Sequence, residues 1–222
     1  MPASKKQSMQ STAYDFIKKK ITTCEYAPNQ MLSESLLQAE LGFSRTPVRE
    51  AISRLAQEGL LKVFPKRGIV VSGFTFSDIN MIFEVRTLVE PYTLLNYGIK
   101  LNLDEIARFS KRLQAECAAS FDSSFYQVDD EFHSMLVAVL PNVYLRELYN
   151  RIQTQNIRLR IMSGQHTANR LAETNEEHLQ ILSACLAQDW QAAAQAMALH
   201  LQRSKEASLA ALMQGDVSAQ II

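Results

Sequence analysis

Four residues with metal-ligand chemistry lie in the second half of the chain. Asp129 and His133 stand four positions apart, so a helix would place both side chains on one face. His178 and His200 follow, each among apolar residues with helical spacing. A carboxylate oxygen and three imidazole nitrogens form a donor set that suits Zn²⁺, Ni²⁺ or Fe²⁺. By spacing alone the same residues also fit ordinary core or surface histidines, and both interpretations stay open.

The elements that must position these ligands are helices. After about residue 75 the apolar spacing is helical throughout, and no strand-like alternation is evident. Pro91 is expected to kink the first helix, and breaks fall at Pro141 and Gly164, with His166 in a loop outside the ligand set. The helices are expected from Ser77 or Asp78 onward and then near residues 103–118, 123–140, 143–162, 169–187 and 190–213. Six helices of this length can bury a core as a bundle.

Basic and hydroxyl side chains form a second candidate site near the N-terminus. Arg45 and Arg49 lie one helical turn apart and would project from one face, within reach of guanine edges or phosphates. Ser44 and Thr46 open the same segment, and either can cap the helix. Thr46 and the free amides at this helix start also suit a phosphate group. These residue types at this spacing indicate DNA binding, although isolated arginines also occur on ordinary solvated helix faces.

The elements around these residues predict a winged helix-turn-helix. One short helix starts at Ser33 and ends at Gly42, and a second runs from residue 44 or 46 to Gly59. Two β-prone runs then flank a Pro-Lys-Arg-Gly turn, which predicts a hairpin with a basic tip. Arg67 and the side-chain-free Gly68 would let this tip approach the DNA backbone or the minor groove.

Composition agrees with two dissimilar domains. The net charge is zero, but residues 1–76 carry net +5 and the remainder carries net −5. A basic module joined to an acidic one is expected when only the first contacts nucleic acid. The three cysteines show no CxxC pair, no signal peptide is visible, and no apolar run is long enough for a membrane span. We therefore expect a cytoplasmic, mainly α protein: a winged helix-turn-helix at residues 1–75 and an all-helical bundle at residues 76–222.

Four segments of the first domain resemble the DNA-binding signature of the GntR superfamily. They are LSE at 32–34, LGFSRTPVREA at 41–51, EGL at 58–60 and PKRG at 65–68. The resemblance implies that Arg45, Thr46, Arg49 and Gly68 contact the operator. The chain departs from the pattern at Ser35, where many members carry a basic residue.

The second domain resembles the FCD effector domain of FadR-like GntR regulators. The matching residues are Glu84, Arg86, Glu90, Asp129, Phe132, His133, Glu177, His178, Asp189, Ala193, Met197 and His200. The resemblance implies a divalent metal ion, Zn²⁺ first with Ni²⁺ and Fe²⁺ as alternatives. Its ligands would be Asp129, His133, His178 and His200.

An effector site is implied next to this ion. In the family an organic acid's carboxylate often fills the remaining coordination positions. We expect Arg86 to clamp a second carboxylate through its planar, two-pronged guanidinium. Arg160 and Asn156 are further effector-binding candidates, and Arg158 and Gln155 are weaker ones.

Three functions fit these observations. The favoured one is a ligand-responsive regulator that binds a metal ion and a small organic acid and contacts a palindromic double-stranded DNA operator as a homodimer. A metal-dependent enzyme acting on a small acid, with an appended winged helix, is the alternative. A winged module used only for protein contacts is the third. Against the enzyme, the chain has no HExxH pair and no Gly-rich phosphate loop. Against the third, the wing is basic.

Overall fold

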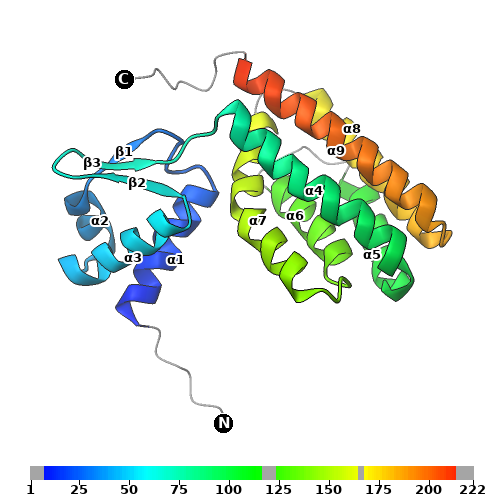
Figure 1. Ribbon diagram of the computed structural model, residues 1–222, viewed down its shortest axis with the longest axis horizontal. Coiled ribbons are helices and arrows are strands. Elements are labelled where there is room, and N and C mark those ends of the chain that lie inside the picture. Colours follow the sequence, from blue (N-terminus) through cyan, green and yellow to red (C-terminus); the bar gives the residue numbers. More distant parts are fainter. Residues whose placement is uncertain (1–7, 117–123, 165–167, 214–222) are drawn as a thin grey trace, which may run out of the picture. The chain divides into compact units, whose positions relative to one another are not determined.

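The chain folds into two compact units. The computed structural model describes residues 8–116, 124–164 and 168–213. One unit ends at Phe74 and the other begins at Thr75. Nine α-helices, one 3-10 turn and one small sheet make up the regular structure of these described residues (Figure 1).

Three helices and a three-stranded antiparallel sheet form the first unit. In chain order they are α1 (Met9–Thr22), β1 (Met31–Leu32), α2 (Glu34–Leu41), α3 (Arg45–Gln57), β2 (Leu61–Phe64) and β3 (Gly68–Val71). The strand order is β1-β3-β2, so β3 is central. Apolar side chains from all three helices and the sheet share one core, which includes Ile17, Leu37, Leu55 and Val71.

Local chemistry explains the helix-turn-helix. Ser33 caps α2 by accepting a hydrogen bond from the Leu36 amide at 3.1 Å. Gly42 ends that helix with φ of +67°, a conformation that favours glycine. Ser44 is the N-cap residue of α3, and its side chain makes no capping hydrogen bond. The predicted tight turn between two short helices is therefore present.

The wing is the β2–β3 hairpin, and a third strand accompanies it. The two-residue strand β1 pairs with β3 through Met31–Val70 and Leu32–Ile69, a pairing that the sequence analysis did not predict. Gly68 has φ of +116°, and a Cβ there would lie 3.2 Å from the Leu32 carbonyl oxygen. Glycine at this position thus has a structural cause in the sheet itself.

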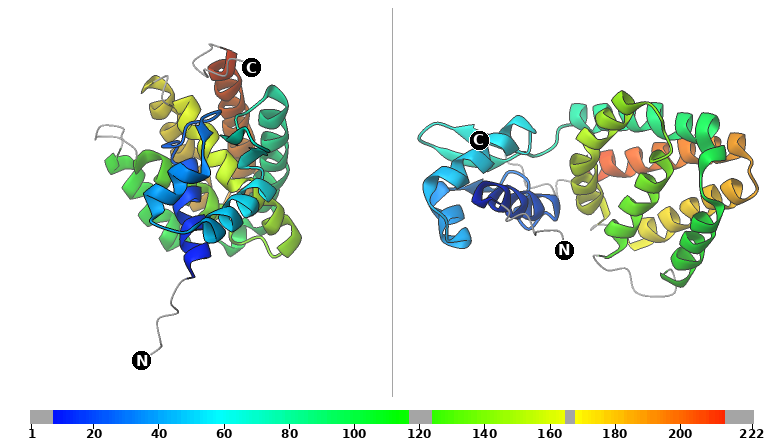
Figure 2. Two further views of the ribbon diagram at one scale, coloured as in Figure 1. Left: turned by 90° about the vertical axis from the view of Figure 1, so that its left-hand side faces the viewer. Right: turned by 90° about the horizontal axis from the view of Figure 1, so that it is seen from below.

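Six α-helices form the second unit (Figure 2). They are α4 (Phe76–Tyr97), α5 (Leu103–Glu116), α6 (Ser124–Val137), α7 (Val143–Gly164), α8 (Ala168–Leu186) and α9 (Trp190–Met213), with a 3-10 turn η1 (Gly98–Lys100) after α4. All six expected helices are present, and no described residue after Val71 lies in a strand. None of the described helices is long and apolar enough to cross a membrane.

Helix α4 organises the second unit, since it packs against α9, α7 and α6. Thr75 and Asp78 form a capping box, so α4 begins slightly earlier than the predicted start at Ser77 or Asp78. Pro91 lies within the helix, which continues to Tyr97. Val89 of α4 packs with Val137 of α6 and Tyr149 of α7 in a buried cluster.

Candidate functional site

The predicted DNA-contacting side chains of α3 are exposed at its N-terminus. Ser44, Arg45, Thr46 and Arg49 are all accessible to solvent. The Ser44 hydroxyl makes no capping bond, and the first amides of the helix have no intrahelical partner. Such a helix start can receive a phosphate, while the two arginines reach past it.

Arg49 is held in place by a carboxylate from the preceding helix. Its Nε donates to both Glu34 oxygens at 2.9 Å, and 63% of the Arg49 side chain is exposed. Because only Nε is used in this contact, the planar guanidinium is oriented from its base. Glu34 belongs to the LSE segment, but its position in the sequence alone did not predict this role.

The wing tip presents the remaining predicted contacts. Arg67 is exposed in the turn, and Gly68 opens β3. Lys66, next to Arg67, has φ of +63° and is also exposed. The hairpin thus carries two adjacent basic side chains at its tip.

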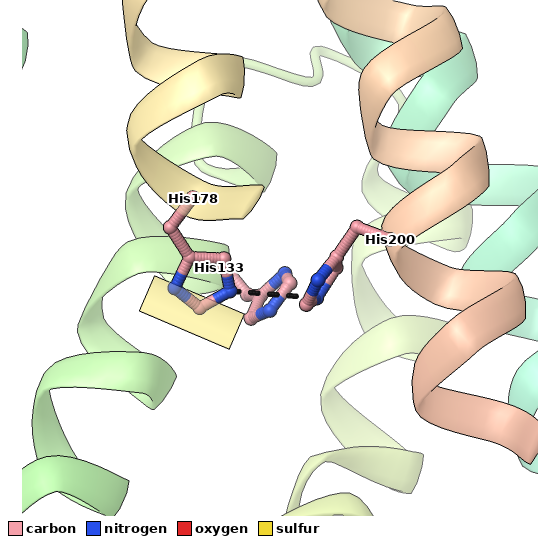
Figure 3. Close-up of side chains that lie close together, drawn as sticks. All are labelled: His133, His178 and His200. Atoms are coloured by element: carbon pink, nitrogen blue, oxygen red, sulfur yellow. Dashed lines mark hydrogen bonds between the residues drawn. The ribbon is translucent and has the colours of Figure 1, made fainter. Parts of the chain in front are cut away.

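Three histidines from three different helices meet in the second unit. His133 of α6, His178 of α8 and His200 of α9 are buried, and each offers a nitrogen within 4.8 Å of the others (Figure 3). The Nε2 atoms of His178 and His200 are 3.4 Å apart. Far-separated positions in the sequence thus form one cluster with the chemistry of a metal centre.

Asp129, the fourth predicted donor, lies beside two of the three histidines. Its Oδ1 lies 3.4 Å from His178 Nε2 and 3.8 Å from His133 Nε2, and the residue is only 5% exposed. A tetrahedral ion with bonds of about 2.0–2.1 Å separates neighbouring ligand atoms by roughly 3.3 Å. The separations of His178 Nε2 from Asp129 Oδ1 and from His200 Nε2 are close to this value, so these donors suit a divalent ion, while His133 Nε2 also lies 3.2 Å from Arg86 Nη2.

Two buried glutamates orient the histidines. Glu90 Oε2 lies 2.6 Å from His133 Nδ1, and Glu177 Oε2 lies 2.8 Å from His200 Nδ1. A carboxylate that accepts the Nδ1 proton leaves Nε2 unprotonated and able to bind a metal. Both glutamates belong to the residues that match the FCD pattern, but this role was not predicted, because nothing in their spacing shows which nitrogen they approach.

The electrostatics of the cluster favour neutral imidazoles. Burial lowers the pKa of His133 well below its usual value, and the charges of Arg86 and Arg160 lower it further. Burial likewise lowers the pKa of His178 and of His200. Since a metal binds the neutral ring, these side chains need lose no proton near pH 7.

A cavity of about 50 Å³ adjoins the cluster. Asp129 and His200 line it, as do the three predicted effector-binding residues Arg86, Asn156 and Arg160. The weaker candidates Arg158 and Gln155 are not among its described lining residues. The structure therefore brings the predicted ligand and effector residues to one place, while His166 lies outside the described residues.

The predicted clamp Arg86 already has partners within the chain. Its Nε donates to Glu90 Oε1 at 2.7 Å, and Nη1 donates to Asn156 Oδ1 at 3.2 Å. Because arginine has no acceptor, Asn156 must turn its oxygen toward Arg86. The Nδ2 donor of Asn156, which is 1% exposed, then has no partner among the described residues.

A further arginine at the cavity escaped the sequence analysis. Arg170 of α8 donates to the two Glu177 oxygens at 2.8 and 3.0 Å, and it also lines the cavity. Glu177 has a pKa lowered to about 2: burial raises it, but the hydrogen bonds from His200 and Arg170 outweigh that effect. The seven-residue separation from Glu177 was the available signal for this pair.

Both domains match known families. Residues 9–71 match the bacterial regulatory proteins of the gntR family, and residues 81–203 match the FCD domain. The chain belongs to the GntR family of bacterial transcriptional regulators and carries an FCD domain. It is therefore a DNA-binding regulator of transcription and not an enzyme, in agreement with the favoured interpretation of the sequence.

Relatives of this GntR regulator span nearly its whole length. It is 26% identical over 204 residues to the HTH-type transcriptional repressor RspR of Escherichia coli K12, covering 90% of this chain and 89% of that protein. A GntR regulator from Rhodococcus sp. RHA1 shares the fold with a TM-score of 0.75 and 22% identity, over 90% of this chain and 97% of that one. Escherichia coli McbR/YncC gives 0.75 and 21%, over 93% and 98%.

Proposed function

We propose that this regulator senses a small carboxylate together with a divalent metal ion and changes its operator binding in response. The observation that carries the proposal is the convergence of His133, His178 and His200 beside a cavity that Arg86 and Asn156 line. Asp129 and the three histidines would hold the ion, Zn²⁺ first, with Ni²⁺ and Fe²⁺ as alternatives. The ion would supply a Lewis-acidic anchor for a carboxylate oxygen.

The charges around the cavity support an anionic effector. Each arginine of the cavity is paired with a carboxylate: Arg86 with Glu90, Arg160 with Asp129, and Arg170 with Glu177. A divalent ion would add two positive charges to this balanced and buried set. An anion offsets that charge, and the unpartnered Nδ2 of Asn156 can donate a hydrogen bond to it.

The DNA-binding half would act as part of a homodimer on a palindromic operator. Two α3 helices of a dimer can enter successive major grooves about one DNA turn apart. Arg45 and Arg49 would contact bases, while Ser44, Thr46, Arg67 and Gly68 would contact the backbone. The name of RspR describes a repressor, which supports repression as the mode of action here.

One experiment tests the sensor half. The purified protein is stripped of metal and titrated with Zn²⁺, and its melting temperature is measured with a panel of small carboxylic acids, because a ligand of the folded state raises it. We expect His178→Ala to abolish Zn²⁺ binding and the metal-dependent response. Asn175→Ala is the control, since Asn175 is buried on the same helix but bonds to the Leu113 carbonyl. If the unsubstituted protein binds no metal, the sensor assignment is wrong.

A separate experiment tests the DNA-binding residues. Sites are selected from a random DNA pool with the full-length protein, and affinities are measured at fixed salt. Arg49→Ala is expected to cost about 1–3 kcal/mol of binding free energy. Arg54→Ala is the control, because Arg54 lies on the same helix but stacks on the Tyr14 ring at 3.8 Å. Equal affinities of the two variants would contradict a base-reading role for Arg49.

A further inference from the structure

One face of α4 is exposed and apolar. Met81, Leu88, Tyr92 and Leu95 are all at least 42% exposed, and Ile99 in the following turn is 76% exposed. Their spacing of seven, four, three and four residues places them along one stripe of the helix. We call this set the α4 stripe.

The exposed surface around the α4 stripe has almost no charge. Between Asn80 and Ile99, Glu84 is the single charged residue among the exposed positions. Solvent-facing helix surfaces normally carry many charges, and an extended apolar stripe indicates an interaction surface. The α4 stripe is therefore expected to bind another protein chain.

The residue types along this face of α4 are complementary to those of a second copy of the helix that runs antiparallel to it. We consider two copies of α4 packed antiparallel, with the two-fold axis passing through Leu88. The residue numbers of each facing pair then add up to 176, which is twice 88. Met81 then faces Leu95, Asn80 faces Asn96, and Glu84 faces Tyr92 of the other copy. Any helix face is symmetric in spacing, but in these three pairs the residue types also agree: apolar with apolar, amide with amide, and carboxylate with hydroxyl. Ile99, in the turn after the helix, would face Ser77.

We infer that the α4 stripe is the surface through which two copies of this chain associate. A two-fold interface must be self-complementary, and this face meets that condition. Glu84 would find a hydrogen-bond donor in the partner's Tyr92, so its charge would not be buried without a partner. The inference rests on the proposed homodimer and assigns the helix that forms it.

The same helix contributes to the effector cavity from its other side. Arg86 and Glu90 alternate with the stripe and are buried against α6 and α7, where they contact His133, Asn156 and Tyr149. A shift of α4 on effector binding would therefore move the residues of the dimer contact as well. This arrangement supplies a short physical link between ligand and partner.

Cysteine cross-linking tests the contact and its register. Leu88→Cys is expected to form an intermolecular disulfide on mild oxidation, since both copies meet at the axis. Leu95→Cys alone should not, because its two copies would lie about 21 Å apart along the helices at 1.5 Å per residue. Mixing Leu95→Cys with Met81→Cys protein should restore the cross-link. The unsubstituted chain, oxidised in parallel, controls for its own three cysteines.

Sedimentation measures the strength of the contact. Leu88→Arg is expected to raise the dimer dissociation constant at least 100-fold with unchanged helix content, because 68% of Leu88 is exposed within one chain. Leu186→Arg on α8 is the matched control and should leave the dimer intact.

Three outcomes would overturn the inference, and the last of them would also contradict the homodimer in the proposed function. If the protein is a dimer that Leu88→Arg does not weaken and Leu88→Cys does not cross-link, the homodimer stands but the α4 assignment is wrong. A cross-link through Tyr92→Cys in place of Leu88→Cys would contradict the register. A chain that is monomeric with and without operator DNA would refute both the assignment and the proposed dimer.

Discussion

A single carboxylate, Glu90, connects the two halves of the proposed sensor site. Its Oε1 accepts hydrogen bonds from Arg86 Nε at 2.7 Å and from the Tyr149 hydroxyl at 3.0 Å. Its Oε2 approaches His133 Nδ1 at 2.6 Å. Glu90 is 1% exposed, so it is a buried charge that depends on these partners. It positions both a proposed metal ligand and a proposed effector clamp.

Replacing Glu90 by glutamine should weaken metal binding without removing any ligand. We expect Glu90→Gln to lower Zn²⁺ affinity roughly 10–100-fold, because an amide orients His133 Nδ1 less strongly than a carboxylate does. The measurement is chelator competition on the metal-free protein. Glu131→Gln is the control, since Glu131 lies on the same helix as His133 but is exposed and paired with Arg112. Equal affinities for all three proteins would show that Glu90 has no positioning role.

A second carboxylate makes the winged domain sensitive to acid. Hydrogen bonds from Lys20 and then Tyr26, each 2.8 Å long, lower the pKa of Glu40 below 4.5. A lowered pKa in the folded state stabilises the fold at pH values above 4.5, and this contribution is lost as pH falls through the folded-state pKa. Glu40→Gln should therefore lose stability at pH 6 and show a shallower decline between pH 5 and pH 3. Urea unfolding at several pH values checks this, and parallel declines would contradict it.

At the scale of elements, the junction of α4 and α9 depends on a close approach. Gly98 follows the last residue of α4, and a Cβ at this position would overlap with Cε3 of Trp190, the first residue of α9. The φ of Gly98 is −52°, so the backbone does not itself require glycine. Packing against the indole therefore explains this residue, and it lets two helices that line the cavity beside the histidines meet at their ends.

Gly98→Ala separates helix propensity from packing. In an open helix, alanine would be favoured over glycine by about 1 kcal/mol. Here we expect a net loss of about 1–3 kcal/mol, because overpacking against Trp190 outweighs that gain. Chemical unfolding measures the difference. In a Trp190→Leu background the cost of Gly98→Ala should largely vanish, and a persistent cost there would refute the steric explanation.

At the scale of the whole molecule, the two units differ in their predicted binding partners and in the sign of their net charge. The apolar core of the first unit is formed within residues 13–71, and the proposed ligands all lie in the second unit. The positive net charge of residues 1–76 favours DNA, while the rest of the chain is net negative. A ligand of the second unit must therefore stabilise that unit in the first instance.

Calorimetry can test this division. We expect two unfolding transitions in the metal-free protein, with added Zn²⁺ raising only the one that belongs to the FCD domain. At a free metal concentration 100 times the dissociation constant, the stabilisation should be about 2.7 kcal/mol. His178→Ala should keep both transitions but lose the shift. A Zn²⁺-dependent shift of both transitions together would contradict independent units.

Local chemistry determined the order and type of the elements. Ser33, Gly42 and the turn at residues 65–68 act on neighbouring backbone, so caps, turns and helical spacing predicted the helix-turn-helix, a hairpin and six further helices. Residues 31–32 escaped prediction because so short a strand exists only through pairing with β3. The four proposed ligands were predicted from residue types and resemblance, since i, i+4 spacing joins only Asp129 to His133.

Tertiary packing decided the rest of the site. It brings His178 and His200 to His133, sets Glu90 and Glu177 behind two of the rings, and gives Arg86 partners on α6 and α7. It also determines which face of α4 is buried and which remains apolar and exposed. These relations join residues 22 to 70 positions apart, and hydrogen bonding, burial and charge act through space, where sequence separation carries no information.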